Sequence, residues 1–196
     1  MMNGNFFAMM SRMKYIERWA LMRNTREENL SEHCLDVSMI AHALCVIGNA
    51  RYGKNLDADK AALIGMYHDA SEIITGDMPT PVKYYNHTIK DAYKMLEEEA
   101  NHKLLNQLPE DIRAYYNDIF FKDEEHEYEW KLVKAADKIS ALIKCMEEIK
   151  TGNREFVKAK ESIEQTVKKM EEDYPEVRDF VAEFLPSYAK TLDELN

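Results

Sequence analysis

Glycine and proline, the residues that most often end a helix, are scarce in this chain: six and five among 196 residues. Apolar residues recur with a helical period, and no run of alternating β-branched residues indicates a strand. Only the stretch TGDMPTPV at residues 75–82 is strongly punctuated, because its glycine and two prolines forbid a continued helix. The sequence therefore predicts an all-α protein.

The apolar periodicity predicts a series of helices in one domain. A chain of this length buries roughly 70% of its unfolded surface, which is enough for a core without disulfides. No linker, repeat or low-complexity segment divides it, so residues 1–196 are expected to form a single domain. The helices are expected at residues 5–17, 31–51, 57–75, 88–107, 110–121, 125–150, 154–173 and 175–192, with an irregular charged stretch at 20–30.

Charge and cysteine content narrow the partners and the compartment. The net charge of −10 repels nucleic acid polymers and anionic membranes, so we expect a phosphate-bearing partner to be a small molecule. Cys34, Cys45 and Cys145 form no CxxC pair and indicate a reducing compartment. The opening apolar patch has no basic residue before it, and the other apolar stretches read as too short to span a bilayer. We therefore expect a cytoplasmic protein with no membrane partner.

The segment AALIGMYHDASEII at residues 61–74 is apolar nearly all the way round, as a helix in the middle of a domain would be. Apart from Tyr67, its ionisable side chains are His68, Asp69 and Glu72, which fall within an arc of about 100° on a helix. Buried charges are costly unless they are paired or bind a metal ion. The clustering therefore predicts a functional site.

His33 lies on the core-facing stripe of the preceding helix, whereas His42 points about 180° away, toward solvent. Taken alone, His33 would more often be a satisfied core histidine than a ligand. Beside His68 and Asp69 on the next helix, a shared metal site is the favoured interpretation. Asp137 sits at the margin of the apolar stripe of its own helix, close to lysines, and periodicity alone would place it in solvent.

The order of His33, the adjacent pair His68 and Asp69, and Asp137 resembles the H…HD…D pattern of HD-domain metal-dependent phosphohydrolases. Three longer segments are similar to the bacterial 5′-deoxynucleotidase branch of that superfamily: RWALMRNTREENLSEH (18–33), MYHDASEIITGDMPTPVKYY (66–85) and LVKAADKISALIKCMEE (132–148). The resemblance covers nearly the whole chain. It implies a single-domain HD-type helical bundle, a homodimer and four metal ligands: His33, His68, Asp69 and Asp137.

Two imidazoles and two carboxylates suit one borderline metal ion in six-coordinate geometry, with two positions left for water and a phosphate oxygen. Co²⁺ or Mn²⁺ fits this mixed set; Fe²⁺, Zn²⁺ and Mg²⁺ are alternatives, although Mg²⁺ prefers oxygen and water. A closed structural zinc site would more usually recruit cysteine. Cys34 follows His33 directly, but adjacent helix positions do not face the same point.

Two side chains are candidates for the chemistry itself. Glu72 lies one turn after His68 and could act as a general acid or base, or could only orient His68. Arg18 is a candidate to bind the phosphate through two N–H groups. Trp19 beside it either belongs to the core or offers an aromatic surface to the substrate. The resemblance implies that Arg18 orients the phosphate and that Trp19 lies against the sugar, where the indole would exclude a 2′-hydroxyl.

The punctuated loop is the expected rim of the pocket, because its prolines stiffen the chain and it presents short polar groups. The resemblance implies that residues 77–80 contact substrate; alternatively, Asp77 only closes an Asx-type turn. The full set of expected substrate contacts is Arg18, Trp19, His33, Asp77, Met78, Pro79, Thr80 and Asp137.

The leading hypothesis is a metal-dependent 5′-nucleotidase that hydrolyses nucleoside 5′-monophosphates, preferring the deoxy form, to nucleoside and phosphate. The runner-up is another HD-type phosphohydrolase, acting on a nucleoside triphosphate, a cyclic nucleotide or a guanosine alarmone. Longer polyphosphates would call for more basic residues than Arg18, Arg23, Arg26 and Lys83 supply near the motifs. A third hypothesis, a non-catalytic nucleotide-binding helical module, would need neither Glu72 nor Arg18.

Overall fold

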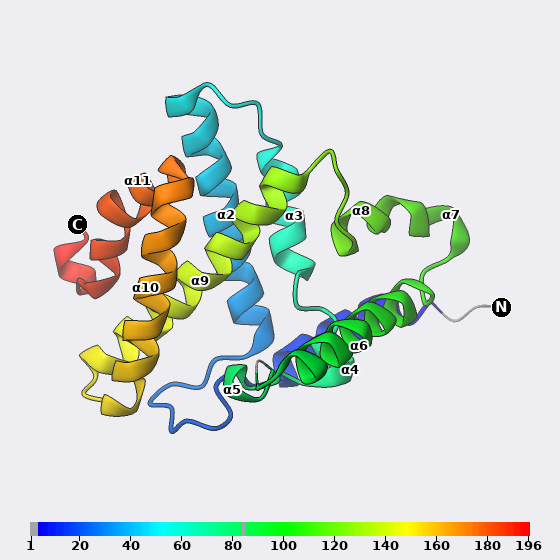
Figure 1. Cartoon of the computed structure of the whole chain (residues 1–196), viewed down its shortest axis with the longest axis horizontal. Helices are drawn as coiled ribbons and strands as arrows, with labels where there is room; N and C mark the ends of the chain where they lie inside the picture. The colour runs from blue at the N-terminus through cyan, green and yellow to red at the C-terminus, as the bar shows by residue number, and fades with distance from the viewer. Residues whose placement is uncertain (1–3, 84) are drawn as a thin grey trace.

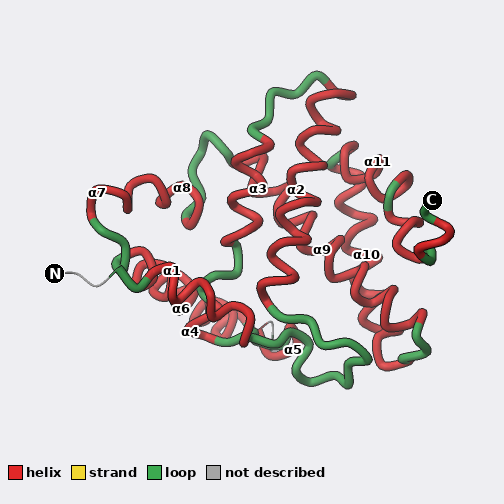
Figure 2. The backbone as a smooth tube through the Cα atoms, turned by 180° about the vertical axis from the view of Figure 1, so that it is seen from behind, coloured by secondary structure: helices red, strands yellow, loops and turns green. Residues whose placement is uncertain are grey.

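The computed structural model describes residues 4–83 and 85–196, so residues 1–3 and 84 of the expected domain lie outside the described residues. Within the described part, helices make up the regular structure, and the chain is 74% helical. The β-type pairing found there is an isolated bridge between Glu17 and Asn29. The all-α prediction is confirmed (Figures 1 and 2).

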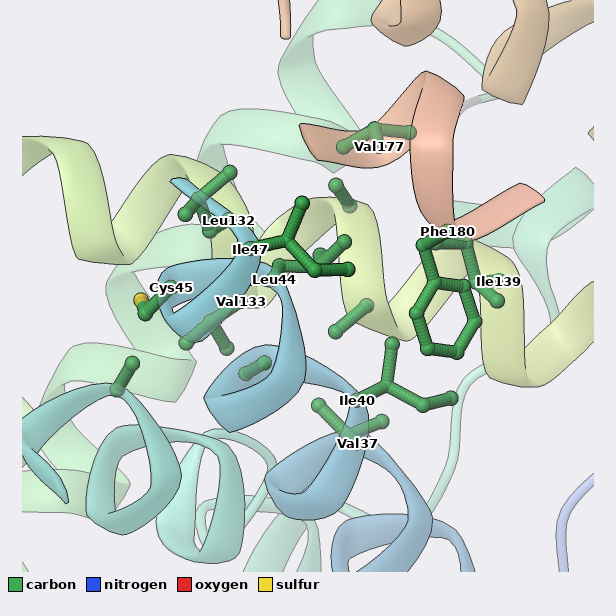
Figure 3. Close-up of a cluster of buried hydrophobic side chains, with 14 of the residues drawn as sticks. Val37, Ile40, Leu44, Cys45, Ile47, Leu132, Val133, Ile139, Val177 and Phe180 are labelled. Atoms are coloured by element: carbon green, nitrogen blue, oxygen red, sulfur yellow. The ribbon is translucent and has the colours of Figure 1, made fainter. Parts of the chain in front are cut away.

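Two long helices, α2 (Leu30–Tyr52) and α9 (Glu127–Lys150), and the shorter α3 (Ala58–Tyr67) form the centre of the fold. The helices α10 (Val157–Asp173) and α11 (Pro175–Glu183) pack against α9 and α2. Figure 3 shows apolar side chains of α2, α9 and α11 meeting in one buried cluster. Its labelled members are Val37, Ile40, Leu44, Cys45, Ile47, Leu132, Val133, Ile139, Val177 and Phe180.

Strong local signals set both ends of α2. The Asn29 side chain accepts the N–H groups of Ser31 and Glu32, while the Glu32 carboxylate accepts the Asn29 N–H, which makes a capping box. Gly53 ends the helix at a φ of 63°, a left-handed conformation that glycine adopts readily. The N-terminal turn of α2 is therefore fixed in place.

The expectation that every apolar stretch is too short to cross a membrane was wrong for α2. By length and composition alone this helix qualifies as a membrane span, but 56% of its apolar window is buried inside the protein. The apolar residues of α2 pack against α3, α9 and α11.

A second group of helices lies at the N-terminal end of α2: α1 (Phe6–Met10), α4 (Glu72–Thr75), α5 (Thr80–Lys83) and α6 (His87–Leu105), as both views show. The short helices α7 (Glu110–Arg113) and α8 (Asn117–Phe120) follow α6. This group has its own core of Phe6, Ala70, Leu104, Leu105, Leu108, Ile119 and Phe120.

The helix expected at 57–75 is two helices. It breaks in a four-residue turn between α3 and α4, where His68 Nδ1 donates to the Gly65 carbonyl oxygen at 2.7 Å and backbone N–H groups bond three residues back. These bonds tighten the chain and end the helix. His68 and Asp69 therefore lie in a turn at the end of a helix rather than within one.

Other expected helices are shorter or divided. The segment 5–17 holds α1 and a 3₁₀ turn, the segment 110–121 holds α7, another 3₁₀ turn and α8, and the α-helix of segment 175–192 ends at Glu183. Conversely, α5 begins inside the loop that was expected to lack helix. Pro81 falls in the first turn of α5, where a missing N–H costs no hydrogen bond.

Gly65 lets α2 and α3 approach closely. A Cβ atom placed there would lie 2.8 Å from the Cα atom of Ser38 on α2, closer than real Cβ contacts. The close crossing puts the first turns of α2 beside the end of α3. His33 and His68 consequently lie side by side, with ring centroids 5.3 Å apart.

Candidate metal centre

Three predicted ligands converge where α2 meets the end of α3. One ligand atom each of His33, His68 and Asp69 lies within 4.8 Å of the other two. The Asp69 Oδ2 atom is 3.1 Å from His68 Nε2 and 3.6 Å from His33 Nε2. The structure thus brings together the residues that clustered on the apolar helices of the sequence.

Asp137 reaches the same place from α9. Its Oδ1 atom lies 3.3 Å from His33 Nε2, and its Oδ2 atom accepts a hydrogen bond from Lys138 Nζ at 2.9 Å. The side chain is 21% exposed. Periodicity alone, which placed Asp137 in solvent, was therefore wrong.

Hydrogen bonds on the Nδ1 side orient both imidazoles. The bond from His68 Nδ1 to Gly65 fixes the proton on that nitrogen. On the other ring, His33 Nδ1 lies 3.1 Å from the Ser140 Oγ atom of α9. With Nδ1 engaged, the Nε2 atom of each ring faces the shared point.

The two Nε2 atoms are buried and have no hydrogen-bond partner among residues 4–83 and 85–196. The nearest carboxylate oxygens lie 3.1 Å from His68 Nε2 and 3.3 Å from His33 Nε2, without the geometry of a hydrogen bond. Buried polar atoms are nearly always paired in proteins, so two unpaired nitrogens facing one point require an explanation. Two such nitrogens beside two carboxylates are a suitable donor set for a divalent cation. The residues present therefore fit a metal ion.

Cys34 was expected not to face the same point as His33, and the structure places its thiol on the far side of the His68 ring. Its Sγ atom lies 3.8 Å from His68 Nδ1, because the turn after α3 brings that ring over the start of α2. The thiol touches the Nδ1 side of the ring, opposite the Nε2 atom. Burial raises the pKa of the Cys34 thiol, so the group is neutral and does not offer a thiolate to a metal.

The two carboxylates stay ionised although burial opposes it. Burial alone would raise the pKa of Asp69, but the neighbouring His68 and His33 hold it well below its usual range. Burial would likewise raise the pKa of Asp137, while its contact with His33 and the charge of Lys138 lower it. Burial also lowers the pKa of His33, which keeps that ring neutral. These are the protonation states that a cation needs in Asp69, Asp137 and His33. His68 differs: burial would lower its pKa, but the neighbouring Asp69 raises it well above the usual value, so a cation would have to displace a proton from this ring.

Glu72 begins α4 and is 5% exposed. Burial, and then repulsion from Asp69 and Asp77, raises the pKa of the Glu72 carboxyl to about 9. Its Oε2 atom has no hydrogen-bond partner in the described part of the chain. Glu72 is therefore a protonated carboxyl at neutral pH, able to give its proton to a group that enters the site. The group that orients His68 is the Gly65 carbonyl, not Glu72.

Arg18 lies beside the predicted ligand Asp69, and Trp19 follows it in the irregular segment before α2. Arg18 Nη1 is 3.5 Å from Asp69 Oδ2, and the arginine side chain is 11% exposed. The Arg18 backbone N–H donates to the Glu28 carbonyl, which folds the segment back on itself. The half-buried Trp19 ring packs on Phe156, with ring centroids 5.3 Å apart. Trp19 is therefore partly open to solvent rather than enclosed in the core.

The loop after Gly76 contributes Asp77, whose carboxylate accepts the backbone N–H of Trp19. This contact joins two segments that are far apart in sequence. Met78 and Pro79 are half-buried next to it, and Thr80 is exposed at the start of α5. The structure brings Asp77 near Glu72 and Arg18, while substrate contacts of all four loop residues stay predictions.

Two residues that touch the site were missed by the sequence analysis. Ser140 lies one helical turn after Asp137, so its spacing could have identified it as a neighbour of the ligands. Glu28 accepts hydrogen bonds from both Arg18 and Trp19, yet it stands in a charged stretch where no periodicity distinguishes it from the glutamate before it.

Comparison with known proteins identifies relatives along the whole chain. The family model described as 5′-deoxynucleotidase YfbR-like matches residues 5–188. A 5′-deoxynucleotidase from Erwinia tasmaniensis is 47% identical over 196 residues, which covers 100% of this chain and 98% of the relative. A 5′-deoxynucleotidase from Vibrio parahaemolyticus is 45% identical over 196 residues and covers 100% of both chains.

Solved structures share the architecture at lower identity. An HD-domain phosphohydrolase from Listeria innocua aligns with a TM-score of 0.82 at 24% identity, covering 94% of this chain and 88% of that one. The HD phosphohydrolase DatZ of cyanophage S-2L, solved with dA and one catalytic Zn²⁺, aligns with a TM-score of 0.63 at 19% identity, covering 94% and 96%. These likenesses show a common helical fold.

Proposed function

This chain belongs to the 5′-deoxynucleotidase family of HD-domain metal-dependent phosphohydrolases, and we propose that it releases phosphate from deoxyribonucleoside 5′-monophosphates with one divalent cation. It is a phosphoric monoester hydrolase, because its relatives at 47% and 45% identity are named 5′-deoxynucleotidase. The proposed metal ligands are His33, His68, Asp69 and Asp137.

The observation that carries the ligand set is the pair of buried, unpaired Nε2 atoms facing two ionised carboxylates. A cation bound there would lower the pKa of water and screen the charge of the phosphoryl group. The mixed nitrogen and oxygen donors favour Co²⁺ or Mn²⁺ over Mg²⁺. The related fold of DatZ, solved with one catalytic Zn²⁺ and dA, is consistent with a single metal and a small nucleotide ligand.

Glu72 is the proposed general acid. In the reaction, the bond between phosphorus and the 5′-oxygen breaks, and a new bond forms between phosphorus and a water oxygen. The leaving 5′-oxygen takes the proton of the Glu72 carboxyl, and a proton from the attacking water restores it. The raised pKa of Glu72 supports this role, because the carboxyl holds its proton at neutral pH.

Arg18 and Trp19 are proposed to hold the two ends of the substrate. Arg18 engages Glu28 and Asp69 through Nε and Nη1, and its Nη2 group is the proposed donor to phosphate oxygens. Trp19 is proposed to lie against the sugar and exclude a 2′-hydroxyl. Asp77, bonded to the Trp19 backbone, is proposed to contact the same sugar.

We also propose that the protein is a cytoplasmic homodimer. The exposed face of α2 carries Leu35, Met39 and Val46, which are 54%, 55% and 45% exposed, and a second copy of the chain is the proposed cover. Light scattering should give twice the chain mass for the wild type and half that value for Met39→Glu. A monomeric wild type would refute the dimer.

The proposed cytoplasmic location is supported by the cysteines. Cys34, Cys45 and Cys145 are all free and buried, which suits a reducing compartment.

A substrate panel tests the proposed reaction. The protein is stripped of metal, and phosphate release is measured from ribo- and deoxyribonucleoside 5′-monophosphates after addition of Mn²⁺, Co²⁺, Mg²⁺ or Zn²⁺. We expect release only with metal, faster for dAMP than for AMP, and strongly reduced in His68→Gln. An exposed histidine of α6, His102→Gln, is the matched control and should behave as the wild type. No release from any nucleotide with any metal would refute the proposal, and equal rates for AMP and dAMP would remove the role of Trp19.

A further inference from the structure

Glu28 lies behind the two proposed substrate-binding side chains rather than among them. Its Oε2 atom accepts a hydrogen bond from Arg18 Nε at 3.1 Å and another from Trp19 Nε1 at 3.0 Å. The Glu28 side chain is 13% exposed, so water competes little for that oxygen. One carboxylate oxygen therefore fixes the position of the indole relative to the guanidinium.

The contacts continue from Glu28 to the metal centre. Arg18 uses its Nε atom on Glu28 and its Nη1 atom on Asp69, at 3.5 Å. The indole, the Glu28 carboxylate, the guanidinium and the Asp69 carboxylate thus form an unbroken series. A displacement of Glu28 would therefore move both the indole of Trp19 and the guanidinium of Arg18 beside Asp69.

Trp19 is held in a conformation that it would not adopt by itself. Its φ of 60° is in the left-handed region, and it is the single non-glycine residue with positive φ in the described part of the chain. Such strain persists only where surrounding contacts impose it. Here the contacts are Glu28 on the indole N–H, Phe156 on the ring and Asp77 on the backbone N–H. Removing one of them should let the indole move.

We propose that Glu28 is a positioning residue that sets Trp19 and Arg18 relative to each other, so that selection of the sugar and orientation of the phosphate depend on one carboxylate. This inference rests on the proposed 5′-nucleotidase function. A carboxylate suits the position because both partners are donors, and it accepts from both. A glutamine there would have to turn its own donor group away from two others, and its neutral oxygen would bind each of them more weakly.

The test compares Glu28→Gln with Glu27→Gln, which makes the same charge change at the neighbouring, exposed position. For each, kcat and KM are measured with dAMP and with AMP at saturating Mn²⁺. We expect the ratio of kcat/KM for dAMP over AMP to fall about tenfold in E28Q, because a charge-assisted hydrogen bond is lost. The KM for dAMP should rise, and Mn²⁺ affinity should stay at the wild-type value.

A spectroscopic measurement follows the indole directly. In a Trp130→Phe background, Trp19 is the remaining tryptophan of the chain. Its fluorescence maximum should shift in E28Q and stay unchanged in E27Q. A loss of dAMP selectivity together with this shift is an effect that a merely structural role of Glu28 would not produce.

Wild-type selectivity and KM in E28Q would overturn the proposal, and so would an equal change in E27Q. If E28Q fails to fold, Glu28→Asp serves instead, because it keeps the charge but is one carbon too short to reach both donors. Unchanged selectivity in E28D would also overturn the proposal. A wild type that releases no phosphate refutes the proposed function, whereas a selective wild type with an equally selective E28Q refutes only this inference.

Discussion

Helix α9 carries two polar clusters that differ in whether their buried polar atoms have hydrogen-bond partners. Asp137 and Ser140 face the metal centre, while Lys144 and Glu148, further along the helix, form an ion pair with side chains only 4% and 2% exposed. The Glu148 carboxylate accepts hydrogen bonds from Lys144 Nζ at 2.5 Å, from Asn153 Nδ2 at 2.8 Å, and from two backbone N–H groups of the segment before α2 at 2.8 and 3.1 Å. This Lys144–Glu148 cluster is complete in itself.

The metal centre has the opposite character, because its two Nε2 atoms and the Glu72 Oε2 atom are buried without a hydrogen-bond partner in the described residues. Burial of charge does not by itself mark a functional site. Glu176 makes the same point: it is 0% exposed, yet it is paired with Lys54 at 2.9 Å and accepts a hydrogen bond from Tyr128 at 2.7 Å. What distinguishes the site is that several side chains with unused bonding capacity lie together beside two carboxylates.

The largest expected effect comes from Glu72→Gln, which keeps the shape of the side chain and removes its acidic proton. We expect kcat to fall about 10³-fold, the loss typical of a general acid. The affinity for Mn²⁺, measured by calorimetry, should stay near the wild-type value because Glu72 is not a proposed ligand. Glu99→Gln, at an exposed position of α6, is the control and should keep full kcat. An E72Q variant with wild-type turnover would exclude the proton transfer.

In the Lys144–Glu148 cluster the expected effect is on stability instead. Glu148→Ala leaves the Lys144 ammonium buried without its partner and frees the segment before α2. We expect the free energy of unfolding to fall by about 3 kcal/mol, measured by urea denaturation of the metal-free protein. The neighbouring exposed Glu147→Ala should change it by no more than about 0.5 kcal/mol. Equal, small losses in both variants would mean that the cluster contributes little.

The pH dependence of that stability has a definite sign. Burial alone would raise the pKa of Glu148, but its hydrogen bonds from Lys144, Asn153 and the backbone hold it well below the usual 4.5. Its contribution is therefore present above pH 4.5 and lost as the pH falls toward the lower, folded-state pKa. We expect the stability gap between wild type and Glu148→Gln to shrink between about pH 6 and about pH 3. A gap that is constant or grows on acidification would contradict this.

Some features of the site are visible in the sequence pattern, whereas others depend on contacts that exist only in the folded chain, and only the first kind could be predicted. His33, His68 and Asp69 were identifiable because a polar side chain on an apolar helix is conspicuous in the pattern itself. The break after α3 was not, because residues 61–74 have no helix-breaking residue apart from one glycine, and the bond of His68 to Gly65 exists only in the folded turn. The boundary therefore depends on contacts rather than on period.

Contacts between distant segments explain the other features that the sequence analysis did not predict. Glu148 bonds to Thr25, a separation of 123 residues, and nothing in the spacing of either helix or loop reveals that pairing. Asp137 looked exposed because its stripe is defined by α9 alone, whereas the site is completed by α2 and the end of α3. Periodicity reports which face of one helix is apolar. It does not report which other element closes over the margin of that face.

Ser140→Ala is the smallest of the expected effects and sharpens the comparison most, because Ser140 and Lys144 lie one turn apart on the same helix. The change removes the group that engages His33 Nδ1, so the imidazole loses the contact that directs its Nε2 atom toward the cation. We expect Mn²⁺ affinity, measured by calorimetry, to fall about tenfold, as is usual when such an orienting partner is lost. Ser162→Ala, exposed on α10, should leave the affinity unchanged. If S140A binds Mn²⁺ as tightly as the wild type, the orientation of His33 is set by packing alone, and the metal centre is less dependent on α9 than the Lys144–Glu148 cluster is.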